Sequence, residues 1–438
     1  MQGDKLTLAA VGDCQTGTRH SPCKDPRFLE LVEILRGVDV AYANQEMVMH
    51  NFGPNCFPRG KRNRGDTGTV THAPPFVADE LKWMGFDMVS TACNHACDWM
   101  YGGLKETIDN LDRVGLTHAG TGMNLAEARA PGFFDSEQGR VALITVDTST
   151  PMFAAGDARR DAPGRPGMSP VRVSRKVTLD PKAFEGMRQV TNVLRSLGIG
   201  HSQEPLPADV KEIDPYLESG PWSVKFVLGD KPGIMSIPDE KDVKEVMQIV
   251  SDARRQADWV IVTQHHHLND GADKDWPSKA AEKFARTCLD EGADAYIGTG
   301  AHRIQGIEIY KGRPIFYCLP DFIQQRDLGK APPQDYYEAF GLGFTNTPMD
   351  AQDARGLRVT PPPRGSGMVV STFNKHRVVD IKLYPVDPLA DLQRWQWGRP
   401  IRADEAMGRK IVEHWAKLSE PYGTKIDYEK GVGIVKLP

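Results

Sequence analysis

The sequence lacks the features that mark membrane proteins and nucleic-acid-binding proteins. No apolar run approaches the roughly 18 to 20 residues of a membrane helix, and no charged segment followed by a long apolar one opens the chain. We therefore expect no membrane contact and a cytoplasmic location. The formal net charge is only −4, so no global basic field favours nucleic acid. The expected partner is a small-molecule or peptide-like anionic substrate, and the oligomeric state stays open.

Cysteine is scarce and follows no paired pattern. The seven cysteines are an odd number without a regular framework, which is typical of reduced thiols. Cys93 and Cys97 flank His95, which makes a structural zinc site conceivable, but no second cysteine pair supports it. We interpret Cys14 and Cys93 as small buried thiols, because free cysteine is commonly buried.

The apolar pattern alternates between strands and helices over most of the chain, which predicts an α/β fold. Strands are predicted at residues 6–11, 38–43, 86–90, 140–146, 259–263 and 295–297, and a hairpin at 305–317. Helices are predicted at 28–35, 75–84, 104–111, 181–197, 239–256 and 279–291.

The chain divides into a core and two additions. We predict a core at residues 1–322, interrupted at 151–238 by a stretch rich in proline, glycine and charge. This interruption is interpreted as an insertion or a lid. Residues 323–438 are predicted to return strands and a helix to the core.

Six polar residues each stand just past a predicted strand: Asp13, Glu46, Asn94, His95, His265 and His302. In open α/β sheets, ligands bind beyond the carboxyl ends of the strands. Carboxylate, amide and imidazole together suit Mn, Fe or Zn at a catalytic site. A carboxylate such as Glu46 or Asp13 can bridge two ions, and His95 beside a ligand can move a proton. Taken alone, Asn94 and His95 are equally consistent with a hydrogen-bonded loop.

Other histidines and arginines are weaker candidates for substrate binding. Strand alternation sends His265 and His267 to one face and His266 to the other, so at most two of them are expected to reach the same metal. His266 is interpreted as supporting or structural, and His267 is a candidate for substrate binding. Arg59 and Arg62 lie in a basic stretch that is either a solvated turn or a clamp for an anionic group. His72 is a further candidate for substrate contact, with surface placement as the alternative.

Taken in order, these motifs resemble the bacterial capsule-synthesis protein CapA (poly-γ-glutamate) family, a branch of the calcineurin-like metallophosphoesterases. The matching segments are Gly12-Asp13, Asn44-Gln45-Glu46, Cys93 to Asp98, the histidines from 265, Gly292 to Gly298 with His302, and Ile315 to Leu319. The likeness runs from Leu6 to Phe322 and again from Gly367 to Pro385.

The resemblance implies a four-layered α/β/β/α sandwich with one or two divalent ions, Mn, Zn or Fe, between the sheets. By this analogy, Asp13 and His302 bind one metal and Glu46 bridges. Asn94 and His265 bind the second metal. His95 takes the acid–base role, and His265 is a second catalytic candidate.

The chain departs from the family pattern at two expected ligands. Gln15 stands where Asp-x-His requires a histidine, and Gly300 stands where Gly-His-x-His has its first histidine. Asp321 adds a carboxylate where the family usually reads Leu-Gly-Asn-Phe. The centre is therefore mononuclear, weak at one position, or rebuilt with His266 or His267.

The resemblance and the ligand pattern together predict a metal-dependent hydrolase. It would act on a carboxylate-rich or peptide-like substrate through a metal-bound hydroxide. One alternative is a metal-assisted Cα epimerase, since lasso-peptide epimerases resemble the same family. The other is a non-catalytic factor in polymer assembly or export.

Overall fold

The computed structural model describes residues 4–60, 70–149, 151–199, 203–214, 224–271, 273–325, 332–354, 365–388 and 396–438. Within them, strands and helices alternate in a mixed α/β fold, which confirms the predicted class. Each strand and helix predicted from the sequence is present, with shifted ends in several cases.

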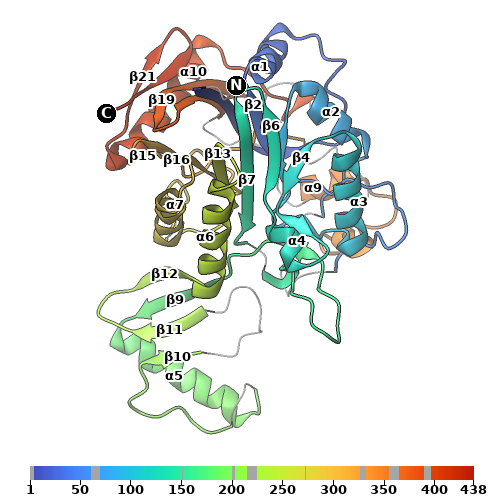
Figure 1. Ribbon diagram of the computed structural model, residues 1–438. Coiled ribbons are helices and arrows are strands. Elements are labelled where there is room, and N and C mark those ends of the chain that lie inside the picture. The colour runs from blue at the N-terminus through green and yellow to red at the C-terminus, as the bar shows by residue number, and fades with distance from the viewer. Residues whose placement is uncertain are drawn as a thin grey trace.

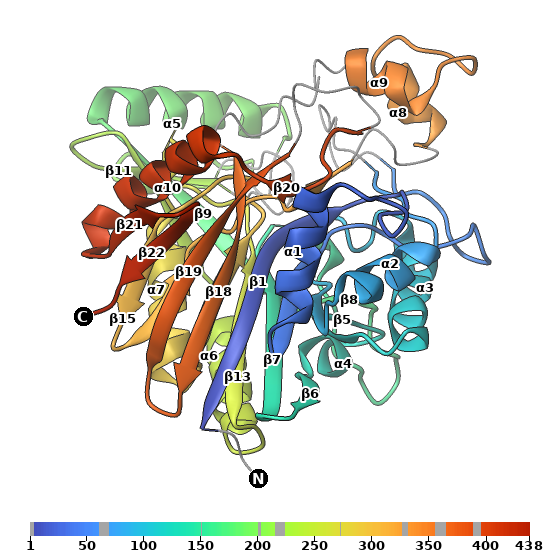
Figure 2. The same ribbon diagram turned by 90° about the horizontal axis from the view of Figure 1, so that it is seen from above.

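The first sheet has ten strands, and β1 lies at its centre. Its path runs β21-β22-β19-β18-β1-β2-β3-β4, with β17 paired to β1 and β20 to β19. The parallel strands are β1 (Lys5–Gln15), β2 (Val40–Gln45), β3 (Met88–Ser90), β4 (Thr117–Ala119) and β17 (Ile323–Gln324). The antiparallel strands are β18 (Ser366–Asn374), β19 (Val378–Asp387), β20 (Ile401–Arg402), β21 (Lys425–Glu429) and β22 (Val432–Lys436). The C-terminal strands thus extend the sheet beside β1 (Figure 2).

The second sheet has six strands in the order β15-β16-β14-β13-β7-β6. They are β6 (Gly132–Ser136), β7 (Gly139–Asp147), β13 (Trp259–His265), β14 (Ala295–Thr299), β15 (Ile307–Tyr310) and β16 (Arg313–Phe316). β7, β13, β14 and β16 are parallel, and β15 forms the predicted hairpin with β16.

Alternation along the strands explains how the two sheets pack. Leu6 and Leu8 of β1 enter a core shared with Trp259 of β13, whereas Ala9 of β1 faces helices outside the first sheet. Val260 of β13 faces helices outside the second sheet. The outer helices are α1 (Pro26–Arg36), α2 (Phe76–Met84) and α3 (Met100–Arg113) on the first sheet, and α6 (Glu240–Arg254) and α7 (Lys279–Asp290) on the second. Trp415 of α10 (Glu405–Ser419) also enters the shared core.

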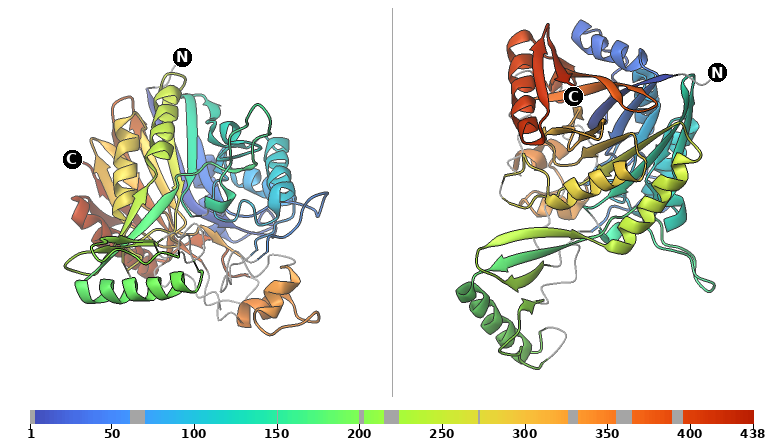
Figure 3. Two further views of the ribbon diagram at one scale, coloured as in Figure 1. Left: turned by 90° about the horizontal axis from the view of Figure 1, so that it is seen from below. Right: turned by 60° about the vertical axis from the view of Figure 1, so that its left-hand side comes forward.

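A small third sheet stands away from this body (Figures 1 and 3). Its order is β10-β11-β9-β12, and the predicted helix, α5 (Pro181–Ser196), packs against it. The strands are β9 (Val173–Leu179), β10 (Glu212–Ile213), β11 (Val224–Leu228) and β12 (Gly233–Pro238). A role as a lid stays a prediction.

Short elements complete the described fold. They are α4 (Leu125–Arg129), α8 (Gln334–Glu338), α9 (Pro348–Ala354), the paired strands β5 (Thr121–Gly122) and β8 (Gly167–Met168), and 3-10 turns at Pro151–Phe153 and Glu420–Tyr422. In the part of the chain that the structure describes, every helix is too short or too polar to cross a bilayer.

Candidate metal centre

The predicted site residues meet where the carboxyl ends of strands from both sheets come together. Asp13 lies near the end of β1, opposite Asn44 of β2, and Glu46 follows β2 directly. His265 ends β13 and pairs in register with Thr299 of β14. Asp13, Glu46 and His265 are all fully or almost fully buried.

Two glycines allow the chain to close around Asp13. A side chain on Gly12 would lie 2.2 Å from the carbonyl oxygen of Pro320, so glycine here lets the segment before Asp321 pass against β1. Gly300 has a φ of +94°, and its amide donates to Asp13 Oδ2 at 3.2 Å. A Cβ there would meet the His266 carbonyl oxygen at 2.7 Å, so this backbone does not accept the histidine of the family pattern. The turn ends at His302, whose φ of +54° is uncommon for a residue with a side chain.

Among the residues that the structure describes, two overlapping groups of side chains could hold a metal ion. One consists of Glu46, His267 and His302, and the other of Asp13, Glu46, His302 and Asp321. Within each group, the ligand atoms all lie within 4.8 Å of one another. The groups unite three predicted ligands with Asp321 and with His267, which the sequence indicated as a substrate contact. Neither group contains a cysteine, and all seven cysteines are free.

The other two predicted ligands, Asn94 and His265, adjoin Glu46. Asn94 Oδ1 lies 2.8 Å from His265 Nε2, which is 3.7 Å from Glu46 Oε1. Ligand atoms about 2.0 to 2.2 Å from one ion stand about 3 to 4 Å from each other, so the 3.7 Å spacing is compatible with a second ion, whereas the 2.8 Å spacing is that of a hydrogen bond, which such an ion would replace.

Hydrogen bonds and charges perturb the titration of the buried groups. Burial alone would raise the pKa of Asp13, but hydrogen bonds and charges from His265 and His302 hold it well below its usual value. Burial alone would lower the pKa of His265, but Asp13 and Glu46 outweigh it and raise the pKa. Burial, followed by the charges of His265 and His302, holds the pKa of His267 well below its usual range. His267 is therefore a neutral imidazole near neutral pH, which is the form that binds a metal.

Buried polar atoms without a hydrogen-bond partner indicate whether a cation would fit this site. Glu46 Oε1 accepts no hydrogen bond, and the buried Nε2 atom of His267 forms none. The carboxylates of Asp13 and Asp321 lie in the same small volume. Buried polar atoms are nearly always paired, so unpaired acceptors among converging carboxylates fit a bound cation. The donor set of oxygen and imidazole nitrogen suits Mn, Fe or Zn.

His95 is oriented by a carboxylate at the edge of this group. Its Nδ1 atom lies 2.5 Å from Asp98 Oδ2, and its Nε2 atom lies 3.8 Å from Glu46 Oε1. An ionised Asp98 accepts but does not donate, so it favours a proton on Nδ1 and leaves Nε2 open toward the centre. Asp98 belongs to the Cys93 to Asp98 motif, but the sequence alone predicted no role for it.

The three remaining candidates for substrate binding occupy different environments. Arg59 is buried, and its Nε atom donates to Asp98 Oδ1 at 2.7 Å. The surface placement expected for His72 is wrong, because its side chain is buried. Its Nε2 atom lies 3.0 Å from the carbonyl oxygen of His50, and its ring stacks on the half-exposed Phe52. Arg62 lies outside the described residues. Substrate binding by these three residues stays a prediction.

Two amide side chains that the sequence left without a role also belong to the site. Gln15, at the position of the expected histidine, donates to Glu46 Oε2. Asn44 donates to Asp13 Oδ1 at 2.7 Å. The sequence carried a signal for Asn44, since it lies near the end of a buried strand, two residues before Glu46.

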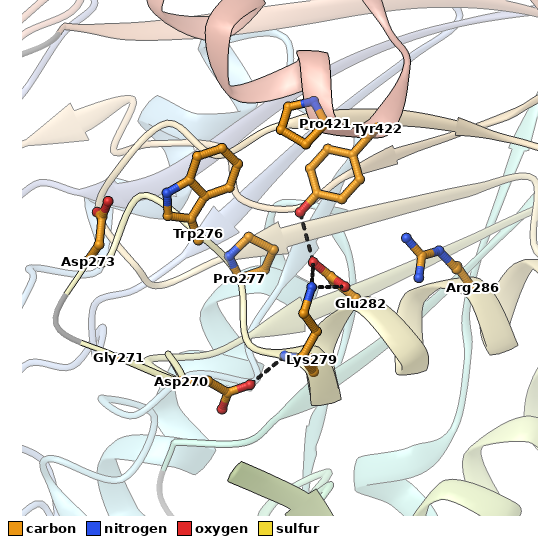
Figure 4. A pocket seen from close by; sticks show the side chains of 10 residues that line it. All are labelled: Asp270, Gly271, Asp273, Trp276, Pro277, Lys279, Glu282, Arg286, Pro421 and Tyr422. Carbon is orange, nitrogen blue, oxygen red and sulfur yellow. Dashed lines mark hydrogen bonds and ion pairs between the residues drawn. The ribbon is translucent and has the colours of Figure 1, made fainter. Parts of the chain in front are cut away.

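A separate cavity of about 670 Å³ lies between α7, the loop before it and the turn at Tyr422 (Figure 4). Tyr422 donates to Glu282 at 2.9 Å, and Lys279 bonds the same carboxylate. Trp276 forms another part of the wall. None of the residues that line this cavity belongs to the two candidate metal groups.

Comparisons with known proteins agree with the family suggested by the motifs. Residues 7–326 match the family model described as "Bacterial capsule synthesis protein PGA_cap". The chain is similar to the protein y4sH of Sinorhizobium fredii, with 30% identity over 99% of this chain and 94% of the relative. It is also similar to the "PGA biosynthesis protein CapA" of Bacillus subtilis, at 25% identity over 82% of this chain and 74% of the relative. A third relative is a "Probable polyglutamine synthesis accessory protein" of Mycobacterium tuberculosis, at 26% identity over 76% of this chain and 62% of the relative.

Proposed function

The chain belongs to the bacterial capsule synthesis protein PGA_cap family, and from this premise we propose that it is a metal-dependent hydrolase. Its substrate would be a carboxylate-rich or peptide-like molecule, in keeping with the relative named for PGA biosynthesis. The observation that carries the proposal is the convergence of Asp13, Glu46, His302, Asp321 and His267 at the strand ends, with unpaired acceptor atoms among them.

The proposal includes a metallophosphoesterase-like sandwich as the scaffold. Two sheets share one core, and helices cover the outer face of each. In such an arrangement, parallel strands from both sheets end at the same edge, where ligands bind. The positions of Asp13 on β1 and His265 on β13 support this reading.

The metal would be held by residues from both sheets. Asp13, His302 and Asp321 would hold one ion with Glu46, and His267 is the alternative fourth ligand. Asn94 and His265 would hold a second ion with Glu46. When bound, the metal would supply Lewis acidity toward a water or a substrate carbonyl.

His95 would carry the proton. Its Nδ1 atom is held by Asp98, and its Nε2 atom faces Glu46. An imidazole fixed in this way can take a proton from one reacting group and return it to another, which typically contributes 10²- to 10⁴-fold in rate.

Metal titration of the full chain tests the metal centre. Glu46→Gln should lower the affinity for Mn, Zn or Fe by about 100-fold or more, because it removes the carboxylate that both candidate groups share. Glu80→Gln is the matched control, since Glu80 is also buried but is bonded to the backbone amides of His20 and Ser21. Equal metal affinity in the two variants would refute the assignment.

Isotope labelling tests the reaction. Hydrolysis of a poly-γ-glutamate substrate in ¹⁸O-water places the heavy oxygen in the new carboxylate. Where His267 does not bind the ion, its unpaired Nε2 atom adds a neutral imidazole beside the centre, which favours Cα epimerisation as the second candidate. In D₂O, epimerisation would place deuterium at Cα without cleavage. If neither label entered the product and metal removal changed nothing, a non-catalytic accessory role would replace both.

A further inference from the structure

We propose that Arg59 is a positioning residue that acts through Asp98 to hold the His95 imidazole in one tautomer and one orientation. The inference rests on the proposed function, because it concerns the same proton-carrying histidine. It moves Arg59 from the expected contact with substrate to a place behind the reacting groups.

The contacts form a continuous path from Arg59 to the centre. Arg59 Nε donates to Asp98 Oδ1 at 2.7 Å, and the Arg59 amide donates to the Asp98 carbonyl oxygen at 2.8 Å. Asp98 Oδ2 lies 2.5 Å from His95 Nδ1. Arg59 and Asp98 thus meet through both side chain and backbone, and the far side of the same carboxylate contacts the imidazole.

Burial explains why this contact constrains the imidazole. The side chains of Arg59 and Asp98 are 3% and 0% exposed. Without a cation, a buried carboxylate either takes up a proton or turns toward other donors. A protonated or rotated Asp98 would no longer accept from Nδ1 in one geometry, so both ring orientations of His95 would become accessible. Arg59 prevents this by holding Oδ1 in one position and by placing its positive charge against the carboxylate.

Thr71 supports Asp98 from a second direction. Its amide donates to Asp98 Oδ2 at 2.7 Å and its hydroxyl at 3.2 Å. These bonds share the oxygen that contacts His95, whereas Arg59 holds the other one. Thr71 therefore limits movement of Oδ2, and Arg59 limits rotation of the whole carboxylate. This division makes the contribution of Arg59 separable by mutation.

The test compares Arg59 with a second buried arginine. Arg129 bonds Asp242 at 2.8 Å, with side chains 6% and 0% exposed, and this pair lies at α4 and α6. The full chain, freed of metal and labelled with ¹⁵N-histidine, is prepared as wild type, Arg59→Gln, Arg59→Lys and Arg129→Gln. His95→Gln assigns the His95 signals in long-range ¹H–¹⁵N spectra.

Wild type and Arg129→Gln should show His95 in the Nδ1–H form only. Arg59→Gln should show a mixture of tautomers, and Arg59→Lys a smaller fraction of the second form, because lysine keeps the charge but lacks the Nε donor. Since the lysine variant keeps the buried charge paired, it carries the test if the glutamine variant does not fold. A wild-type His95 signal in both Arg59 variants would overturn the proposal, as would the same mixture in Arg129→Gln.

Steady-state kinetics of Arg59→Gln give a second measurement when a substrate has been identified. Arg59→Gln should lower kcat by about 10²-fold with little change in KM, because it disturbs proton transfer and not substrate binding. A rise in KM with unchanged kcat would return Arg59 to substrate binding and overturn the proposal. The spectra need no turnover, so a wild type without hydrolase activity would refute the proposed function and leave the positioning of His95 testable.

Discussion

Two clusters of buried charge in this molecule differ in how completely they are paired. At α6, Asp242 accepts from Arg129 on Oδ1 and from the Arg172 side chain on both oxygens, and the Arg172 amide also donates to Oδ2. At the strand ends, Glu46 Oε1 and His267 Nε2 have no hydrogen-bond partner, although other carboxylates lie close by. Both carboxylates are buried, but they differ in their oxygens: both oxygens of Asp242 accept hydrogen bonds, although Arg129 Nε has no partner, whereas Glu46 Oε1 accepts none.

The difference separates structural from functional charge. A carboxylate whose acceptor sites are filled by arginine has no capacity left for a ligand, and its role is to pair with those arginines. A cluster with excess carboxylate and unpaired acceptors is costly in the absence of a cation. The incomplete cluster is therefore compatible with a bound cation, which supports the proposed metal centre.

The largest expected effect on stability is at the paired cluster. Asp242→Ala removes the buried carboxylate that pairs with the buried Arg129, so we expect the free energy of unfolding to fall by about 3 kcal/mol. The loss stays at the lower end for a buried pair because Arg129 keeps its contact with Glu245 and Arg172 is half exposed. Asp321→Asn in the metal-free protein should cost far less, because it reduces repulsion with Asp13 and Glu46. Denaturant unfolding of both variants measures the two costs. Equal losses would remove the distinction between the clusters.

Many strands and helices were predictable because the apolar patterns of neighbouring residues encode them. The apolar run at β1 and the helical spacing of α1 appear in consecutive residues. The pairing of β18 with β1 joins residues more than 350 positions apart, as in Leu6 with Phe373, and no local pattern encodes that choice. The strands of the third sheet were missed because every residue of β9 is only partly buried, which weakens the alternation.

Residues of the candidate site were predictable where a polar side chain stands at the end of a predicted strand. Asp13, Glu46 and His302 were named because each stands at such an end. Asp321 was also named, as an added carboxylate after the last strand, but its place among the candidate ligands depends on the folded backbone, where its segment passes against Gly12. Asp98 and Arg59 are 39 positions apart, so their contact was equally hidden from the sequence.

Two neighbouring histidines after β13 allow a further comparison between a candidate metal ligand and a residue outside the candidate groups. His267→Gln should weaken metal binding by about 10- to 100-fold, because it removes an unpaired imidazole from a candidate group. His266 points elsewhere, with Nε2 3.3 Å from the Tyr317 carbonyl oxygen, so His266→Gln is the matched control. Titration of both variants with Mn or Zn measures the effect. A larger loss in the His266 variant would contradict the assignment.

The smallest effect concerns an unpaired atom outside the candidate metal groups. His20 is fully buried, Nδ1 has no hydrogen-bond partner, and burial, with a smaller effect from the charge of Arg399, lowers its pKa to about 4. Among the described residues, no candidate metal group includes it. We therefore expect His20 to respond to pH and not to metal.

The direction of this pH dependence follows from how His20 binds a proton in the folded and the unfolded protein. Between about pH 6.5, the unfolded value, and pH 4, the unfolded chain binds a proton at this residue that the folded protein rejects. Stability therefore falls as the pH drops through this window, by about 1.4 kcal/mol at pH 5.5 for this one histidine. His20→Gln should flatten the dependence by that amount, whereas His376→Gln, at an exposed position, controls for the loss of a histidine. Denaturant unfolding from pH 4 to 8 measures the difference. Identical curves for wild type and His20→Gln would show that an unpaired buried nitrogen can be protonated without cost, and the argument from unpaired atoms at Glu46 and His267 would lose its support.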